Sequence, residues 1–89
     1  MIMSVHSSHP NIIKRLKRAG GHLQSVIAML EEDRGCLDIT QQLHAVESAI
    51  SNAKKTLIRD HIDHCLEDAV NKSKPKDTIK EFQEITKYL

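Results

Sequence analysis

Two cysteines and one histidine carry most of the potential chemistry of this sequence. His61 and Cys65 are four residues apart, and Cys36 precedes Cys65 by 29 residues. Residues four apart on a helix project from the same face, so His61 and Cys65 can hold one metal ion together. A continuous helix would place Cys36 about 43 Å away from Cys65. One ion therefore cannot bind all three side chains within a single chain.

A pair of chains removes this difficulty. If two copies of the helix pack antiparallel, Cys36 of one chain lies beside His61 and Cys65 of the other. Two thiolates and one imidazole form a soft set that suits Cu(I), and also Zn(II) if a fourth ligand arrives. Ni(II) needs a further nitrogen ligand, which His6 or His9 can provide. The alternative without a metal is that the cysteines are small buried apolar residues.

A long helix is predicted to position these ligands. Residues 36–70 contain no glycine or proline and place an apolar or ligand residue at every third or fourth position, which is typical of an amphipathic helix. The seam comprises Cys36, Ile39, Leu43, Val46, Ile50, Ala53, Leu57, His61 and Cys65.

A second helix is predicted over residues 10–34, which show the same spacing. Pro10 suits the first helical turn, with Ser8 or His9 as the cap. Gly35 is predicted to end this helix. The connection to the helix at 36–70 is so short that the two helices should form an antiparallel hairpin.

The C-terminal part is predicted to add a short third helix. The polar segment 71–77 contains Pro75 and is predicted to be a loop. Thr78 and Glu81 match a capping box, which predicts a helix over 78–89. Residues 1–9 are predicted to be a flexible arm. The expected fold class is therefore all-α, with a long helical hairpin followed by a short helix.

Size and composition favour self-association of a single domain. The chain has 89 residues, 39% of them hydrophobic, with one Phe, one Tyr and no Trp. Such a chain buries a thin core on its own, so oligomerisation is the expected source of further buried area. No apolar signal segment and no run of 18 apolar residues is present, which predicts a cytoplasmic, reduced protein without a membrane span.

Positive charges cluster on both predicted helices although the net charge is only +1. With a turn near residue 35, position 15 should face position 55, so the two clusters are predicted to merge. The merged patch could neutralise DNA phosphates, and the alternative is an ordinary solvated surface. The candidate DNA-binding residues are Lys14, Arg15, Arg18, Lys54, Lys55 and Arg59.

The order of these motifs resembles the CsoR/RcnR family of metal-sensing repressors. The resemblance covers residues 12–65 and is carried by three blocks of residues. These are Arg15-Leu16-Lys17-Arg18 with Gly21, then the run from Cys36 to Val46 (CLDITQQLHAV), then Asp60-His61 with Cys65. Where the family usually has Gln after the glycine of the first helix, this chain has His22.

The resemblance implies an antiparallel dimer with a four-helix bundle, which pairs again into a tetramer. It implies binding to double-stranded operator DNA without effector and release when the effector binds. Cys36, His61 and Cys65 match the copper-sensor ligands, and Glu81 is the candidate for an outer-shell carboxylate. In nickel/cobalt sensors the last ligand is His and an N-terminal His joins.

The sequence therefore predicts a Cu(I)-responsive repressor, with several alternatives left open. The same fold could sense Ni(II) or Co(II), or a thiol-reactive species such as formaldehyde or a persulfide. A protein that only buffers metal would need no DNA. An enzyme is not expected, because no catalytic dyad or cofactor loop is present and a small helical bundle leaves little room for a pocket.

Overall fold

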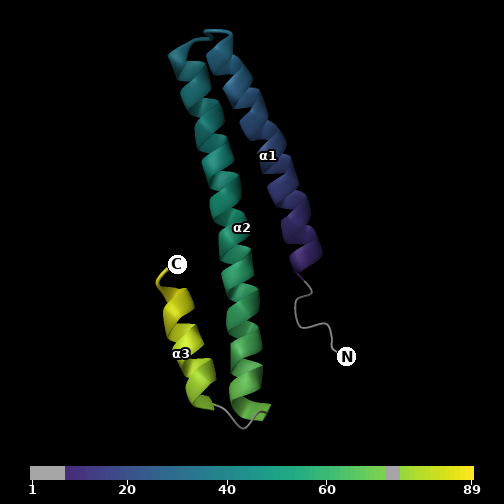
Figure 1. The fold of residues 1–89 in the computed structure, drawn as a ribbon, viewed down its shortest axis with the longest axis vertical. Coiled ribbons are helices and arrows are strands. Elements are labelled where there is room, and N and C mark those ends of the chain that lie inside the picture. Colours follow the sequence, from purple (N-terminus) through teal and green to yellow (C-terminus); the bar gives the residue numbers. More distant parts are fainter. Residues whose placement is uncertain (1–7, 72–74) are drawn as a thin grey trace.

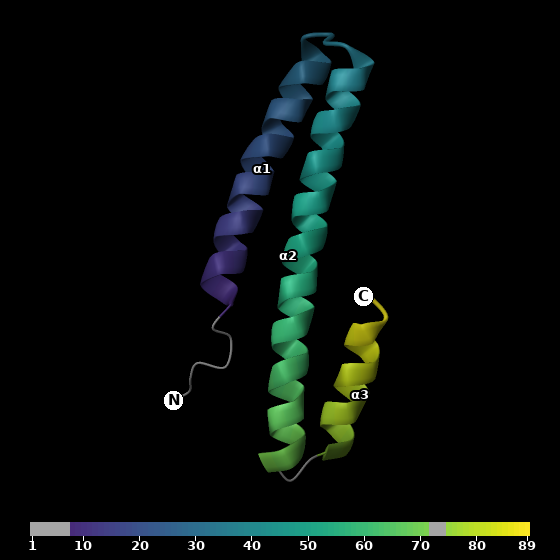
Figure 2. The same cartoon turned by 180° about the vertical axis from the view of Figure 1, so that it is seen from behind.

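Three helices make up the computed structural model, which describes the backbone of residues 8–71 and 75–89 and the side chains of residues 8–64 and 79–89. They are α1 (His9–Glu31), α2 (Cys36–Asn71) and α3 (Pro75–Thr86). Figures 1 and 2 show α1 antiparallel to α2, with α3 along the other side of α2. The predicted all-α class and the helical hairpin are confirmed.

The start of α1 agrees with the prediction that Pro10 lies in the first turn. Ser8 is the N-cap, and the helix begins at His9, so residues 8 and 9 do not belong to an arm as predicted. Ser8 has helical backbone angles (φ −82°, ψ −16°), and its hydroxyl makes no bond to the amides of α1. A capping serine usually has extended angles and makes such a bond. The hydroxyl of Ser8 is thus available to another part of the chain.

The end of α1 differs from the prediction. The helix ends at Glu31, and Asp33 rather than Gly35 takes the left-handed conformation, with φ 60°. Arg34 N–H donates to Met29 O at 3.0 Å and Asp33 N–H donates to Leu30 O at 3.2 Å, which together form a Schellman motif. Gly35 instead precedes α2, where its carbonyl accepts the N–H of Ile39.

The third helix also starts earlier than predicted. It begins at Pro75, so Thr78 lies inside α3 and is not its N-cap, and the predicted loop over 71–77 is wrong for residues 71 and 75–77. Proline fits the first helical turn because its fixed φ and missing N–H cost nothing there. The helix ends at Thr86 rather than Leu89.

The hairpin core repeats every seven residues on both helices. Six of the seven buried side chains in the described residues follow this spacing, namely Ile12, Ala19 and Val26 on α1, and Ile39, Val46 and Ala53 on α2. The seventh is Ile58 on α2. A seven-residue spacing keeps one stripe of each helix against its neighbour. None of the leucines with a described side chain is buried in this core.

A second stripe, also spaced by seven, stays open in the single chain. We call it the leucine stripe; its members are Leu16, Leu23 and Leu30 on α1 and Leu43, Ile50 and Leu57 on α2. Each is between 37% and 59% exposed. The seam predicted for α2 thus divides in two, because Ile39, Val46 and Ala53 face α1 while Leu43, Ile50 and Leu57 do not.

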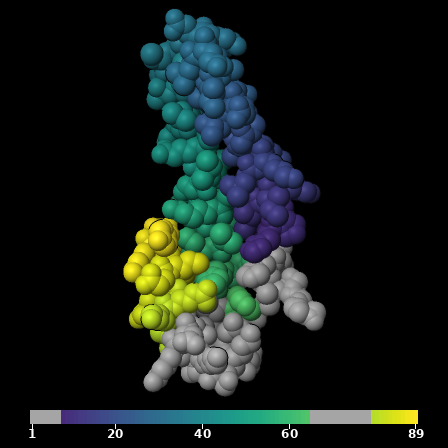
Figure 3. Space-filling model, in the orientation of Figure 1, coloured from purple at the N-terminus to yellow at the C-terminus, as the bar shows by residue number. Residues whose placement is uncertain are grey.

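The molecule is long and flat. Its principal extents are 57 × 27 × 14 Å, and Figure 3 shows the narrow outline with α3 against one end of α2. Figures 1 and 2 show α1, α2 and α3 side by side, so the molecule has a single layer of helices. Within the described residues, no helix is long and apolar enough to cross a membrane.

Candidate metal centre

His61 lies where α3 packs against α2. Its side chain is 20% exposed, and its Nε2 is buried without a hydrogen-bond partner among the described residues. Buried ring nitrogens are nearly always paired, because an unpaired one loses its bonds to water. A metal ion bound at Nε2 would replace those bonds, and this nitrogen therefore fits the role of a ligand.

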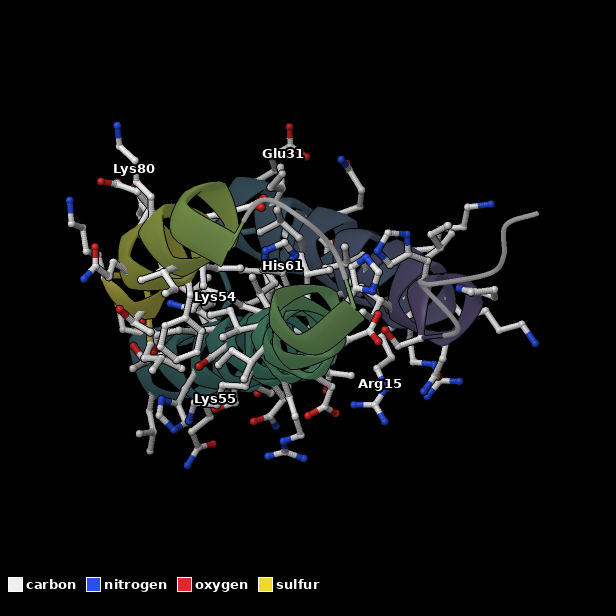
Figure 4. All side chains as sticks on the ribbon, turned by 90° about the horizontal axis from the view of Figure 1, so that it is seen from below. Arg15, Glu31, Lys54, Lys55, His61 and Lys80 are labelled. Atoms are coloured by element: carbon white, nitrogen blue, oxygen red, sulfur yellow. The ribbon has the colours of Figure 1, made fainter. Side chains whose placement is uncertain are left out.

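Glu81 is the carboxylate closest to this nitrogen in the described part of the chain. Its Oε1 lies 3.4 Å from His61 Nε2, although the pair does not meet the angles of a hydrogen bond. Figure 4 shows His61 on the side of α2 that faces α3. Glu81 is 64% exposed on its side chain, so it can turn away while His61 keeps its place. An outer-shell carboxylate needs this proximity to a histidine ligand.

Cys36 stands at the opposite end of α2. It is the first residue of that helix and is exposed as a free thiol. Among the side chains of residues 8–64 and 79–89, no three Cys, His, Asp or Glu gather closely enough to hold a metal ion. One chain thus does not bring Cys36 to His61, as the length of α2 predicted.

The remaining predicted ligands are only partly described. Cys65 belongs to α2, but its side chain lies outside the described residues, and so does His6. His9 is half-buried at the start of α1. His9 and His61 therefore belong to different helices, and the role of His9 as a ligand stays a prediction.

Two hydrogen bonds between α1 and α2 were missed by the sequence analysis. Ser8 Oγ donates to Asp60 Oδ2 at 2.6 Å, and His22 Nε2 donates to Gln42 Oε1 at 2.8 Å. His22 is half-buried. Such pairs depend on the register of the hairpin, which no local pattern reveals.

The hairpin register corrects the predicted meeting of the basic clusters. Arg15 and Arg18 line a hollow of about 320 Å³ whose α2 side contains Ala49 and Asn52, so these basic residues of α1 lie beside a part of α2 that precedes Lys54 and Lys55. The turn between α1 and α2 is centred between Asp33 and Arg34, earlier than assumed. Each residue of α1 consequently lies beside an α2 residue that is slightly nearer the turn than the sequence predicted.

Lys54 and Lys55 line an adjoining hollow of about 570 Å³, and Asn52 contributes to both hollows. In Figure 4, Arg15 and Lys55 lie along one edge of the molecule, while Lys54 lies nearer α3. Lys54 precedes His61 by seven residues and so shares its side of α2. The predicted DNA-binding residues are therefore neighbours on two sides of α2. The side chains of Lys14 and Arg59 are exposed as well.

Comparison with known proteins places these features in a family. The model of a protein family described as "metal-sensitive transcriptional repressor" matches residues 8–88 of this chain. The chain belongs to this family. It is a member of the CsoR/RcnR group predicted from the order of its motifs.

The relatives sense copper, and a similar structure responds to nickel. The copper-sensing repressor CsoR of Bacillus subtilis is 37% identical over 76 residues, which cover 85% of this chain and 75% of that protein. CsoR of Mycobacterium ulcerans is 36% identical, with 85% of this chain and 65% of that protein covered. The nickel-responsive regulator InrS is 26% identical over the full length of both chains, with a TM-score of 0.82.

The family member described here thus spans about two thirds of the length of its mycobacterial relative. The family match over residues 8–88 includes α1, α2 and α3 and therefore every described candidate ligand.

Proposed function

We propose that this chain is a transcriptional repressor that binds operator DNA when metal-free and releases it on binding Cu(I). The observation that carries the proposal is the buried, unpaired Nε2 of His61, close to a carboxylate, at one end of the long helix whose other end holds an exposed thiol. The family match and the copper-sensing relatives support the same function.

The binding site would form between two chains. Cys36 of one chain would meet His61 and Cys65 of its partner if the two copies of α2 pack antiparallel. The leucine stripe supports this assembly, because its side chains lie on α1 and α2 without cover in the single chain. Leu23, Leu43 and Ile50 line a largely apolar hollow of about 550 Å³, which a second copy could fill.

Cu(I) accepts two thiolates and one imidazole as a complete set of ligands. The protein would connect this site to its surroundings. His61 and Glu81 of one chain would link the site to α3 of that chain, and Cys36 of the partner would link it to the turn between α1 and α2 of the partner. Metal binding would thus fix the Cys36 end of α2 in one chain relative to the His61 end of α2 in the other. A tenfold loss of DNA affinity requires only about 1.4 kcal/mol of coupling between metal and DNA.

Ni(II) is the second candidate effector. The structural similarity to a nickel-responsive regulator favours it, and His6 or His9 could supply the further nitrogen ligand that a nickel site needs. Zn(II) and Co(II) accept similar ligands. A sensor of formaldehyde or persulfide would use Cys36 without needing His61.

The first test is an anaerobic titration of the reduced protein with Cu(I) against a chelator, with a labelled DNA fragment from upstream of the gene for this chain. Binding of one Cu(I) per chain with loss of the DNA complex is expected. If Cu(I) saturates the protein and DNA stays bound, while Ni(II) releases it, copper is the wrong effector.

The role in DNA binding needs its own variant. Arg15→Ala should weaken binding to DNA and reduce the dependence of the affinity on salt by about one phosphate contact. Metal binding should stay unchanged. If Arg15→Ala and the wild type bind DNA equally, the hollow that contains Arg15 does not contact DNA. If the wild type binds no DNA, the protein is better explained as one that only buffers metal.

A further inference from the structure

The hydroxyl of Ser8 is used for a contact far along the chain. It donates to Asp60 Oδ2 at 2.6 Å, 52 residues away, and both residues are half-buried. Ser8 is the N-cap of α1, but its hydroxyl makes no bond to the amides of its own helix. A hydrogen bond to a carboxylate is stronger than one between neutral groups. The bond therefore ties the first turn of α1 firmly to α2.

Asp60 immediately precedes His61, so one turn of α2 carries both contacts. Neighbouring residues on a helix point about 100° apart. Asp60 reaches α1 through Ser8, and His61 reaches α3 through Glu81 at 3.4 Å. Any shift or rotation of this turn that follows a change at His61 also moves the carboxylate that Ser8 holds.

The first turns of α1 lead directly to the basic residues. Arg15 follows Ser8 by seven residues, or two turns, and the buried Ile12 between them packs the same stretch against α2. Beyond Arg18, the bond from His22 to Gln42 holds α1 a second time, at 2.8 Å. The basic segment is thus tied to α2 at both ends, and of these two bonds the one at Ser8 adjoins His61.

We propose that Ser8 and Asp60 are positioning residues that transmit a change at His61 to the start of α1 and so to Arg15 and Arg18. This inference rests on the proposed function of a metal-responsive repressor. Neither residue is among the candidate metal ligands or the candidate DNA-binding residues. Their bond would set where the basic segment lies on α2, and a metal that changes the turn at His61 would change that placement.

The proposal predicts a selective effect of Ser8→Ala. A coupling ratio is defined as the DNA dissociation constant with Cu(I) divided by that without it. Allosteric coupling between two sites is typically about 5- to 150-fold. Ser8→Ala should lower this ratio about three- to tenfold, while the affinity for Cu(I) in the absence of DNA stays within about twofold. Ser8→Thr keeps a hydroxyl and should restore the wild-type ratio.

Gln42→Ala is the matched control, because it removes the other bond between α1 and α2 at a place far from His61. It should lower thermal stability about as much as Ser8→Ala and leave the coupling ratio unchanged. Hydrogen exchange provides a readout without DNA. Cu(I) should change the exchange of amides from Ile12 to Arg18 in the wild type and in Gln42→Ala, but not in Ser8→Ala.

The outcomes separate this inference from the proposed function. If the wild type binds no Cu(I), or binds it without a change in DNA affinity, the proposed function fails and takes this inference with it. If the wild type responds and Ser8→Ala responds equally in both readouts, the proposed function stands and the role of Ser8 and Asp60 is wrong. An equal fall of the coupling ratio in Gln42→Ala and Ser8→Ala would likewise overturn the inference, since such a fall would reflect general loosening of the hairpin.

Discussion

His61 differs from His22 and His44 in how its ring is placed. His22 has a hydrogen-bond partner at 2.8 Å, and His44 lies on the surface with its side chain 76% exposed. His61 alone among these three combines burial with an unpaired ring nitrogen. The type of residue and its spacing from Cys65 predicted it as a ligand, while its burial required the packing of α3.

His61→Ala is expected to abolish tight metal binding. Loss of an outer-shell partner already costs about 10–100-fold in metal affinity, and loss of a ligand should cost at least as much. The measurement is an anaerobic competition with a Cu(I) chelator. His44→Ala is the control, because it removes an exposed histidine on the same helix. A thiol sensor would keep its response in His61→Ala, which would contradict the metal site.

Glu81→Gln tests the carboxylate beside His61. The neutral amide no longer orients or polarises the imidazole, so Cu(I) affinity or its effect on DNA should fall about tenfold. Glu84→Gln is the matched control on α3, since Glu84 pairs with Lys87 at 3.0 Å and not with His61. Equal behaviour of the two variants would remove Glu81 from the site.

At the level of helices, most of the fold was predictable, because an amphipathic helix of this length repeats its signal many times. The prediction began α2 at Cys36, where the structure begins it, and ended it one residue short of Asn71. The predicted helix ends were wrong where a single residue determines the start or end of a helix. Pro75 begins α3 although it was assigned to a loop, and Asp33 takes the left-handed position that was assigned to Gly35. The bond from Ser8 to Asp60 depends on the tertiary register, which single-helix patterns do not contain.

The position of Asp33 leads to a prediction about stability. A side chain is disfavoured at φ 60°, so Asp33→Gly should raise the free energy of unfolding by about 0.5–1 kcal/mol. Denaturation by urea measures this change. Gly35→Ala is the control: Gly35 has no positive φ, and an added Cβ meets no atom within 4 Å. A large loss of stability in Gly35→Ala would show that the turn is assigned incorrectly.

At the level of the whole molecule, the hairpin presents opposed surfaces with different properties. Arg15 and Lys55 lie along one edge in Figure 4, and His61 lies toward the other. The leucine stripe runs along the same α2 seam that contains Cys36 and His61. Self-association through this stripe would therefore complete the metal site while it leaves the edge with Arg15 open.

Ile50→Glu tests this assembly. Ile50 is 45% exposed in the single chain, so a charge there should leave the hairpin intact but block packing of a second copy. Light scattering should give a mass near the 10.1 kDa of one chain, against a multiple of it for the wild type. Leu37→Glu is the control, because Leu37 is 73% exposed and lies on another side of α2. An unchanged mass for Ile50→Glu would exclude the stripe as the interface.

The smallest extent of the molecule, 14 Å, has a consequence for the amount of folded protein in a cell. The three helices of a single chain enclose little interior, so assembly with other copies, as proposed above, would add stability by mass action. The folded fraction should rise with the amount synthesised, and newly made chains at low abundance should be degraded faster. The abundance of the protein, and not only the concentration of its effector, would then set a threshold below which its target genes escape control.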